Sequence, residues 1–598
     1  MTLLKDYIKY FLFLFLISGV FYYLIVPIFQ ITNQPVYIFL IGHIIETFIL
    51  SIIVLILLIV FKRKRLALVL AVLFYFIFLA INIIKIRYLS MPLYPVDFQQ
   101  LGNLVKTWDL FKTFIPYAIL ILVIVSLIIW LGYCKEAPSK EVKNKSFYFN
   151  HVFLLLLISS FFIFNNEISM KLREQGIFHK KNSHLPRRCL KYGFLTNFFQ
   201  ASLFIQTTRK PERYSKNKIQ NIVNKYNLNQ FNNTNNKEKP DNIILLLAES
   251  YTDPSDFGWK FTQEPIPVFN KNKLNQISGT VHSPVYGGKS TNAEFEILTG
   301  LTNRFTPIET MPYEEFAREG VSSLAKVLNF NGFNTNAIQV IKFKGFGYGK
   351  IYDYLEFNNK ISLSKDKNLE LDPSNKTTSS REIAKKIINL TKEQKASFIF
   401  AFPNSSHSPW YIKDYPNTMI HLENTSLSKG EEEIISAYAN SINHIDLLYR
   451  ILINEYSNSP RKTLIILLGD HQPGIPNYTK NYIPDLRYNE YINDSLKKYR
   501  TPIQVWSNYL TSNNLSIEIS VNFLPSYILD IANLKYKGFF KFNNLLRNVM
   551  PVFSKVILDA NKSYTDHIPE EFDEMVKDYK LLQYDILFGE NYIYKLTN

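Results

Sequence analysis

Five long apolar runs in the first 166 residues constrain the fold of this 598-residue chain more than any other feature. Each run approaches the roughly 20 residues that a helix needs to cross a hydrocarbon core of about 30 Å. The first run is too long for a cleavable signal peptide, and no small-residue cleavage site follows it. The runs lie at residues 10–29, 37–61, 66–86, 115–134 and 147–165. The sequence therefore predicts an α-helical membrane domain of five transmembrane helices over residues 1–166.

Basic residues between the runs predict how this domain is oriented. Two lysines precede the first run, Lys62–Arg65 separates the second and third, and four lysines separate the fourth and fifth. Because cytoplasmic loops are enriched in Lys and Arg, we expect the N-terminus and these two loops to be cytoplasmic. Five crossings then place residues 166–598 outside the cytoplasm. The fifth run is the shortest, and the alternative interpretation for it is a buried core helix.

The net charge of +17 is unevenly distributed along the chain. Residues 167–240 carry a net charge of +11, whereas residues 241–598 carry −2. The near-neutral balance of the larger part disfavours a nucleic-acid footprint spread over it. Residues 167–240 are predicted to be a basic juxtamembrane segment that ends in a polar, Asn- and Lys-rich linker. The two cysteines, Cys134 and Cys189, are too few for a disulfide scaffold, and on the predicted topology they face opposite sides.

After Pro240 short apolar runs alternate with helical patterns. This alternation predicts an α/β domain with a mostly parallel central sheet over residues 241–550, followed by a C-terminal extension at 551–598. Helices are expected at Ser379–Leu390 and Glu431–Asn454. The predicted strands are Asn242–Ala248, Asn334–Val340, Ser397–Phe402, Thr463–Leu468 and Ile503–Trp506.

Polar residues follow these predicted strands, where parallel sheets place their ligands. Glu249 follows the first strand, and Asp470 and His471 follow TLIILL. Two carboxylates and an imidazole at adjacent strand ends can share one divalent cation, and this donor set suits Mn²⁺, Mg²⁺ or Zn²⁺. The alternative interpretation of Glu249 is a helix cap or a solvated turn.

Residues 285–301 predict a tight turn that opens a helix with a hydroxyl at its start. Backbone N–H groups and the positive end of the helix dipole lie beside such a hydroxyl, which suits a nucleophile that carries a phosphoryl group. The alternative is that Ser290 or Thr291 is the N-cap and Glu294 its capping-box partner.

Taken together, these segments resemble the lipoteichoic acid synthase-like family, a branch of the alkaline phosphatase/sulfatase superfamily. The resemblance covers nearly the whole chain, and the order of its motifs is more specific than any single one. The motifs are Pro92–Phe98, Tyr192–Leu195, Ala248–Ser250, Gly287–Phe295, Tyr438–Ile442 with Asp446, Gly469–Gln472 and Thr501–Ser507.

The resemblance implies that Glu249, Asp470 and His471 bind one metal ion, with Mn²⁺ favoured, and that the oxygen of the nucleophile is a further ligand. Aligned on Asn-x-Glu-Phe, the family's nucleophilic threonine falls on Ser290, with Thr291 the alternative. The implied substrate-binding residues are Lys289, Asn292, His407 and Trp410, and His407 would also assist the leaving group. The alternative for His407 is a histidine of a surface loop. This sequence has Gln339 and Gly347-Tyr348-Gly349 where family members that handle phosphatidylglycerol often carry a His and an Asn-Arg-Asp group.

The resemblance implies that the protein is a multi-pass enzyme of the bacterial cytoplasmic membrane with an extracytoplasmic catalytic domain. It would move a phospholipid head group, phosphoglycerol favoured, onto an envelope glycan or a polyol-phosphate acceptor through a covalent Ser/Thr intermediate.

Three alternatives are weighed against this function. A phosphoethanolamine transferase on the same scaffold is disfavoured because lipid A-modifying members carry several cysteine pairs. A sulfatase needs a Cys/Ser-x-Pro-x-Arg motif, which Ser290-Thr291-Asn292 does not supply. A non-catalytic membrane scaffold would bind no metal, and the retained ligand set and hydroxyl argue against it.

Overall fold

The computed structural model divides into two compact units, Met1–Gln206 and Thr207–Asn598. In the first unit it describes residues 11–16, 18–19, 37–89, 93, 193–195 and 197–198. In the second unit it describes residues 210–597 apart from 213, 233, 235–237, 273–275, 307–311, 316, 342–347, 366–367, 373–377, 413–418, 424–426, 476–486, 488 and 511–514.

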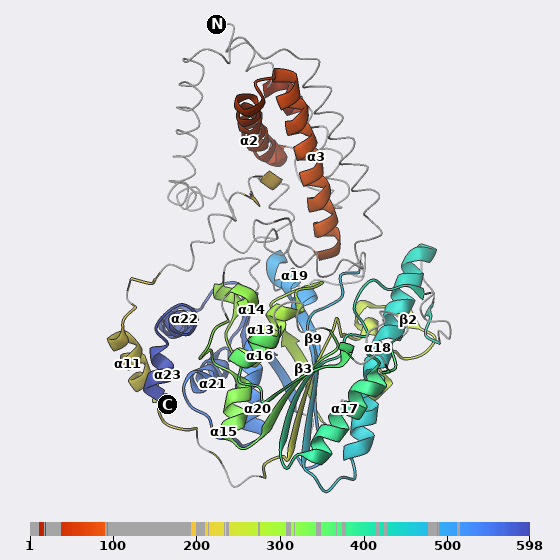
Figure 1. Cartoon of the computed structure of the whole chain (residues 1–598), viewed down its shortest axis with the longest axis vertical. Coiled ribbons are helices and arrows are strands. Elements are labelled where there is room, and N and C mark those ends of the chain that lie inside the picture. The colour runs from red at the N-terminus through yellow and green to blue at the C-terminus, as the bar shows by residue number, and fades with distance from the viewer. Residues whose placement is uncertain are drawn as a thin grey trace. The chain divides into compact units, whose positions relative to one another are not determined.

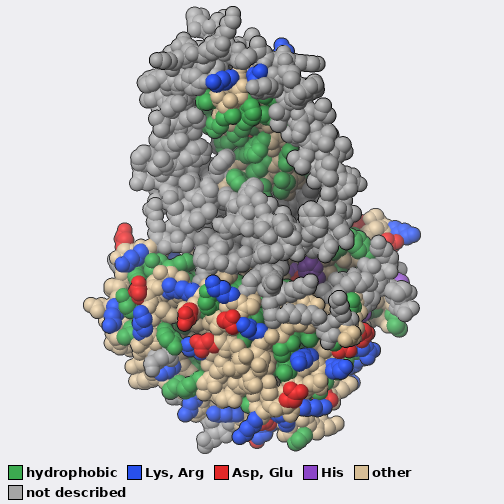
Figure 2. All heavy atoms as spheres, viewed as in Figure 1, with side chains coloured by type: hydrophobic (Ala, Val, Ile, Leu, Met, Phe, Trp, Pro, Cys, Tyr) green, Lys and Arg blue, Asp and Glu red, His purple; other side chains and the backbone are tan. Residues whose placement is uncertain are grey.

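The first unit contains two long apolar helices, α2 (Tyr37–Phe61) and α3 (Lys64–Leu89). They pack against each other and carry exposed apolar side chains on their outer faces, visible as green spheres in Figure 2. Among the described residues, Lys64–Ile83 is the one stretch long and apolar enough to cross a membrane, and Glu46–Phe61 is a shorter apolar helix. The predicted helices at 37–61 and 66–86 are therefore present. The predicted spans at 115–134 and 147–165, and most of 10–29, lie outside the described residues.

The second unit is built on an eight-stranded sheet, as Figure 1 shows. All neighbouring strands are parallel except those that flank β9, which runs antiparallel to β3 and to β8. The mostly parallel sheet is thus confirmed. In spatial order the strands are β10 (Ser516–Ser520), β3 (Ile277–His282), β9 (Arg500–Ser507), β8 (Thr463–Gly469), β1 (Asn242–Ala248), β6 (Ser397–Phe402), β4 (Asn334–Gln339) and β5 (Asn359–Ser362).

Both faces of the sheet are covered by helices, which explains why β1 is an unbroken apolar run. Ile243, Leu245 and Leu247 point into one hydrophobic core, and Ile244 and Leu246 point into another on the opposite face. Helices α17 (Ser380–Glu393) and α18 (Lys429–Tyr456) cover the second face. The first face is covered by α13 (Ser290–Thr299), α15 (Leu324–Phe330), α16 (Tyr348–Tyr354), α20 (Leu524–Ile531) and α21 (Phe539–Val549) (Figure 1).

Shorter elements complete the unit. The helices are α11 (Lys216–Lys225), α12 (Pro267–Asn272), α14 (Pro312–Glu315), α19 (Glu490–Tyr499), α22 (Asp573–Leu587) and α23 (Tyr592–Thr597). A three-stranded sheet contains β11 (Val552–Phe553), β12 (Ile557–Leu558) and β13 (Tyr564–Thr565), and β2 (Lys260–Phe261) pairs with β7 (Leu422–Glu423).

The structured unit is larger than the sequence predicts at both ends. Helix α11 lies inside the predicted linker, yet Ile219, Ile222 and Val223 are buried in the core of the first face. Spacings of three and four residues place these side chains on one helix face, and three apolar residues are too few to stand out in a polar segment. Helix α11 contacts α22 and α23, so the C-terminal extension also packs on this domain.

The buried face of α11 makes a testable contribution to stability. We expect Ile222→Ala to destabilise the domain by about 2–4 kcal/mol, because the truncation leaves a cavity in a packed core. Thermal unfolding of the full chain in detergent measures this effect, with the exposed Asn221→Ala on the same helix as the control. Equal melting temperatures for the two variants would show that residues 216–225 form a linker, as the sequence alone suggests.

Candidate active site

The register of the two central strands brings the predicted metal ligands together. Strands β1 and β8 are parallel neighbours, and Ala248 lies opposite Gly469. The next residue on each strand, Glu249 and Asp470, therefore leaves the sheet at the same edge. His471 follows directly, so all three predicted ligands lie at one point.

Glu249, Asp470 and His471 form a compact buried cluster. One ligand atom from each residue lies within 4.8 Å of the other two. The Nε2 atom of His471 is 3.4 Å from Oε1 of Glu249 and 3.4 Å from Oδ2 of Asp470. The burial of Glu249 excludes the interpretation that it occupies a solvated turn.

The three ionisable groups strongly perturb one another. Burial and then the charge of Glu249 raise the pKa of Asp470 to about 7. Burial opposes a charged imidazole, but the charges of Asp470 and Glu249 outweigh it and raise the pKa of His471. Burial likewise opposes ionisation of Glu249, yet the charges of His471 and His407 lower its pKa. Two carboxylates this close repel each other, and a bound cation relieves that repulsion.

The hydrogen bonds leave ligand atoms for a cation. The Oδ1 atom of Asp470 accepts bonds from the backbone N–H groups of Ser250 (2.7 Å) and His471 (2.6 Å). Its Oδ2 atom is buried without a hydrogen-bond partner among the described residues. The Nδ1 atom of His471 lies 2.9 Å from the carbonyl of Gln472, and an N–H there leaves the lone pair of Nε2 for a metal. The chemistry of this donor set fits one divalent cation.

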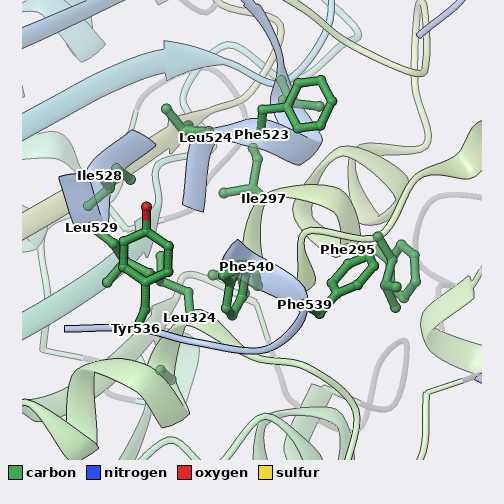
Figure 3. Packing of buried hydrophobic residues seen from close by; sticks show 14 of the residues in the cluster. Phe295, Ile297, Leu324, Phe523, Leu524, Ile528, Leu529, Tyr536, Phe539 and Phe540 are labelled. Atoms are coloured by element: carbon green, nitrogen blue, oxygen red, sulfur yellow. The ribbon is translucent and has the colours of Figure 1, made fainter. Parts of the chain in front are cut away.

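A glycine-rich turn delivers Ser290 to the same cluster. Gly287, Gly288 and Lys289 all have positive φ angles (68°, 153° and 64°), so the chain reverses tightly before α13 begins at Ser290. The opposite side of α13 is fixed in the core of the first face. Figure 3 shows Phe295 and Ile297 among the buried side chains that hold it there.

The two candidate nucleophiles have different environments. The Ser290 hydroxyl donates to Oε2 of Glu249 over 3.0 Å and lies 3.4 Å from Nε2 of His471, and the residue is partly exposed. Thr291 is 7 % exposed, and its hydroxyl is buried without a hydrogen-bond partner among the described residues. Ser290 is therefore the hydroxyl that faces the cluster and can be reached by a substrate. Lys289 is the N-cap, without a side-chain cap bond, so the capping-box alternative is wrong.

The loop after β6 carries the predicted histidine and tryptophan. His407 is exposed, and its Nδ1 atom lies 2.5 Å from the carbonyl of Ser408. Trp410 is buried, its indole N–H donates to the Ser406 carbonyl over 2.9 Å, and its ring packs against Tyr438. Its described contacts therefore hold the loop in place.

Comparison with known proteins identifies the domain. Residues 241–534 match the sulfatase family, and this range contains all the residues of the cluster. Residues 241–534 are therefore a sulfatase-family domain. A curated relative from Rhizobium meliloti (strain 1021), named for cyclic beta-1,2-glucan modification, is 27 % identical over 371 residues, or 60 % of this chain. The chain spans 56 % of the length of that relative.

Two solved structures share the fold of the sulfatase-family domain. The phosphoglycerol transferase GacH of Streptococcus pyogenes, in complex with sn-glycerol-1-phosphate, has a TM-score of 0.51 and 23 % identity, covering 65 % of this chain and 97 % of that one. The integral membrane lipooligosaccharide phosphoethanolamine transferase A of Neisseria meningitidis has a TM-score of 0.54 and 12 % identity. That match covers 88 % of this chain and 95 % of the other.

The sulfatase-family domain also contains supporting residues that the sequence did not single out as such. They fix the backbone beside the ligands, as buried hydroxyls do when they satisfy strand-end carbonyls. These bonds run from Ser283 to the Asp470 carbonyl, from Ser406 to the Glu249 carbonyl, from Thr501 to the Gly469 carbonyl and from Tyr438 to the Ser250 carbonyl. Thr501 and Tyr438 lie within the motifs of the sequence resemblance, but their partners are far along the chain.

The other predicted substrate residues of the sulfatase-family domain lie around the start of α13. Lys289 is partly exposed at the turn, next to Ser290. Asn292 is buried, and its carbonyl accepts a bond from the Asn303 side chain over 3.0 Å. Gln339 ends strand β4 and donates to Tyr352 over 2.6 Å and to Glu294 over 3.3 Å. Gln339, at which the sequence departs from the family pattern, therefore donates a hydrogen bond to Glu294.

Glu294 is an ionisable group buried in this part of the sulfatase-family domain. Burial raises its pKa to about 8, although bonds from Tyr352 and Gln339 partly oppose the shift. In the unfolded chain the Glu294 carboxyl has its ordinary pKa of 4.5. The raised pKa therefore stabilises the folded protein fully below pH 4.5, and this stabilisation is lost as the pH rises through 8.

The neutral variant Glu294→Gln tests this pH dependence. We expect the melting temperature of the wild type to fall between pH 5 and pH 8 by several degrees more than that of Glu294→Gln. Glu393→Gln, at an exposed position of α17, is the control for the change in net charge. Parallel pH profiles for the wild type and Glu294→Gln would show that Glu294 is ionised in the folded protein.

Proposed function

We propose that this protein is a membrane-anchored, metal-dependent transferase that moves the head group of a phospholipid onto a hydroxyl acceptor. The observation that carries the proposal is the position of Ser290. Ser290 is partly exposed, and its hydroxyl lies 3.0 Å from Glu249 and 3.4 Å from His471, at the edge of a cluster whose donor atoms suit a divalent cation. A nucleophile beside a cation-binding site is the arrangement that covalent phosphoryl transfer requires.

The residues have distinct roles in this proposal. Glu249, Asp470 and His471 would hold the cation, Mn²⁺ favoured, and Ser290 would be a further ligand. When bound, the cation lowers the pKa of a coordinated hydroxyl and stabilises negative charge on phosphate oxygens. His407 is exposed, and it would protonate the oxygen of the leaving group.

The proposed reaction has two steps. In the first, the Ser290 oxygen attacks the phosphorus of the lipid, the bond to diacylglycerol breaks, and diacylglycerol leaves with a proton. A phosphodiester on Ser290 remains. In the second step an acceptor hydroxyl attacks the same phosphorus, its proton is removed, and the Ser290 hydroxyl is regenerated. The head group is thereby transferred and Ser290 is free for another cycle.

The relatives support the choice of donor and acceptor. GacH is named a phosphoglycerol transferase, which favours phosphoglycerol as the head group here. The Rhizobium meliloti relative is named for modification of a cyclic glucan, which favours a glycan hydroxyl as the acceptor, with a polyol phosphate as the other candidate. The apolar helices α2 and α3 support an integral membrane protein. The basic residues between the apolar runs favour a catalytic domain outside the cytoplasm of a bacterium.

Diacylglycerol release tests the proposed function. Detergent-solubilised protein is incubated with Mn²⁺ and acyl-labelled phosphatidylglycerol or, in parallel, phosphatidylethanolamine. We expect labelled diacylglycerol to accumulate with the wild type and not with Ser290→Ala. Release from phosphatidylethanolamine alone would assign the head group to phosphoethanolamine, and no release above the Ser290→Ala control with either lipid would contradict the proposal.

A further inference from the structure

A buried carboxylate lies among the apolar side chains of the first unit, far along the sequence from the catalytic cluster. Glu46 belongs to α2 and is 0 % exposed. Charged side chains in apolar helices are rare because they are costly to bury without partners. The partners of Glu46 therefore indicate what the residue does.

Glu46 binds a chain segment that lies about 150 residues further along the sequence. Its Oε1 atom accepts the backbone N–H of Leu195 over 2.7 Å, and its Oε2 atom accepts the hydroxyl of Tyr75 from α3. The Leu195 N–H lies at the start of a helical segment, where a carboxylate is a preferred partner.

The segment fits closely against this carboxylate. Gly193 has a φ of +94°, and a Cβ atom there would lie 2.3 Å from Cγ of Glu46. Phe194 and Leu195 are each 1 % exposed and are buried with side chains of α2 and α3. The ring of Phe198 packs edge-on against Phe78 of α3 at 5.4 Å. Residues 193–195 and Phe198 are thus fastened to the two helices.

A second chain segment is held in the same way. Asn82 of α3 is 0 % exposed, and its side-chain oxygen accepts the backbone N–H of Leu93 over 2.8 Å. Leu93 is buried in the same hydrophobic cluster as Phe194 and Leu195. Buried polar side chains of the two helices therefore serve as attachment points for returning chain.

Further along the chain, Tyr214 is fixed to helix α22 and the residues that follow it in the second unit. Its hydroxyl donates to Oδ1 of Asp585 over 2.6 Å and accepts the N–H of Glu590 over 2.7 Å. Its ring packs edge-on against Tyr584 at 4.9 Å. Between Phe198 and Tyr214 lie residues 199–213, which can span roughly 50–60 Å at full extension. The predicted juxtamembrane segment and linker together, residues 167–240, would span roughly 250 Å if they were fully extended.

We propose that Glu46 is a positioning residue that fastens residues 193–195 to α2 and α3, so that the tether between this part of the chain and the anchor at Tyr214 is at most residues 199–213. The short tether keeps the domain within reach of lipid head groups. The effect of the tether on lipid access rests on the proposed function, whereas the attachment of the segment to α2 and α3 does not depend on it.

Hydrogen exchange of the full chain in lipid nanodiscs tests the attachment. The variants are Glu46→Leu, which removes the acceptor, Gly193→Ala, which adds a clashing Cβ, and Glu46→Gln, which keeps an acceptor oxygen. We expect peptides covering 193–198 to exchange at least tenfold faster in Glu46→Leu and in Gly193→Ala, and to stay protected in Glu46→Gln. Protection of α2, α3 and β1 at the wild-type level shows that both units of a variant are folded, and if Glu46→Leu fails this criterion, Gly193→Ala decides. Unchanged exchange of 193–198 in the folded variants would overturn the attachment.

An activity comparison tests the consequence of the attachment. Glu46→Leu is expected to release diacylglycerol from phosphatidylglycerol vesicles at least tenfold more slowly than the wild type. Hydrolysis of the water-soluble diester bis(4-nitrophenyl) phosphate should stay within twofold. Faster exchange of 193–198 with undiminished release from vesicles would overturn the positioning role. If the wild type releases no diacylglycerol, the proposed function fails and the positioning role fails with it, while the exchange result still decides the attachment.

Discussion

Replacing Ser290 with alanine is expected to lower head-group transfer by about 10³-fold or more, because the attacking oxygen is lost. Ser290→Thr, which keeps a hydroxyl on the same carbon atom, should retain measurable transfer. Initial rates of diacylglycerol release under identical lipid and Mn²⁺ concentrations measure both effects. Binding of Mn²⁺ should persist in Ser290→Ala, since Glu249, Asp470 and His471 remain in place.

Thr291→Val is the matched control for this prediction. Valine has nearly the shape of threonine, and the Thr291 hydroxyl is buried without a hydrogen-bond partner among the described residues. We therefore expect Thr291→Val to transfer within about threefold of the wild type. If Ser290→Ala remained active and Thr291→Val were inactive, the nucleophile would be Thr291 and not Ser290.

Replacing Asp470 with asparagine is expected to weaken Mn²⁺ binding by about 100-fold or more and to abolish transfer. The asparagine oxygen can still accept the N–H groups of Ser250 and His471, so the local backbone keeps its bonds. In place of Oδ2 it presents an amide NH₂, which cannot bind a cation. Titration calorimetry with MnCl₂ on the full chain measures the affinity directly.

Asp446→Asn is the matched control for the metal prediction. Asp446 is also buried, but its two oxygens accept the backbone N–H groups of Val268 and Phe269, and it lies outside the cluster. We expect this variant to lose stability while its Mn²⁺ affinity remains within about threefold of the wild type. Equal Mn²⁺ affinities for Asp470→Asn and the wild type would exclude Asp470 as a ligand.

The core of the sheet and the cluster at its edge could be predicted because both depend on local patterns. Strand β1 coincides with the predicted run Asn242–Ala248, since a strand buried on both faces must be continuously apolar. Once β1 and β8 are recognised as buried strands, the residues after them must meet at one edge. The proximity of Glu249 to Asp470 therefore follows from their positions after the two strands and requires no information on side-chain packing.

Other parts of the fold depend on partners that local sequence does not reveal. Strands β3 and β10 lie at one side of the sheet and carry polar residues among their apolar ones, so they do not stand out as apolar runs. The ring of Trp410 packs on Tyr438, a residue of another element, and no local pattern shows this contact. The bond between Glu46 and Leu195 joins residues 149 positions apart, which no local pattern can show.

The central claim is that Ser290 carries the transferred head group, and the mass of that adduct tests it most directly. The protein is incubated with phosphatidylglycerol and Mn²⁺ without added acceptor, quenched in acid and digested for mass spectrometry. The account predicts a phosphoglycerol adduct on Ser290 of the wild type, absent from Ser290→Ala and from samples without metal. Diacylglycerol release with unmodified Ser290, or with the adduct on another residue, would contradict it.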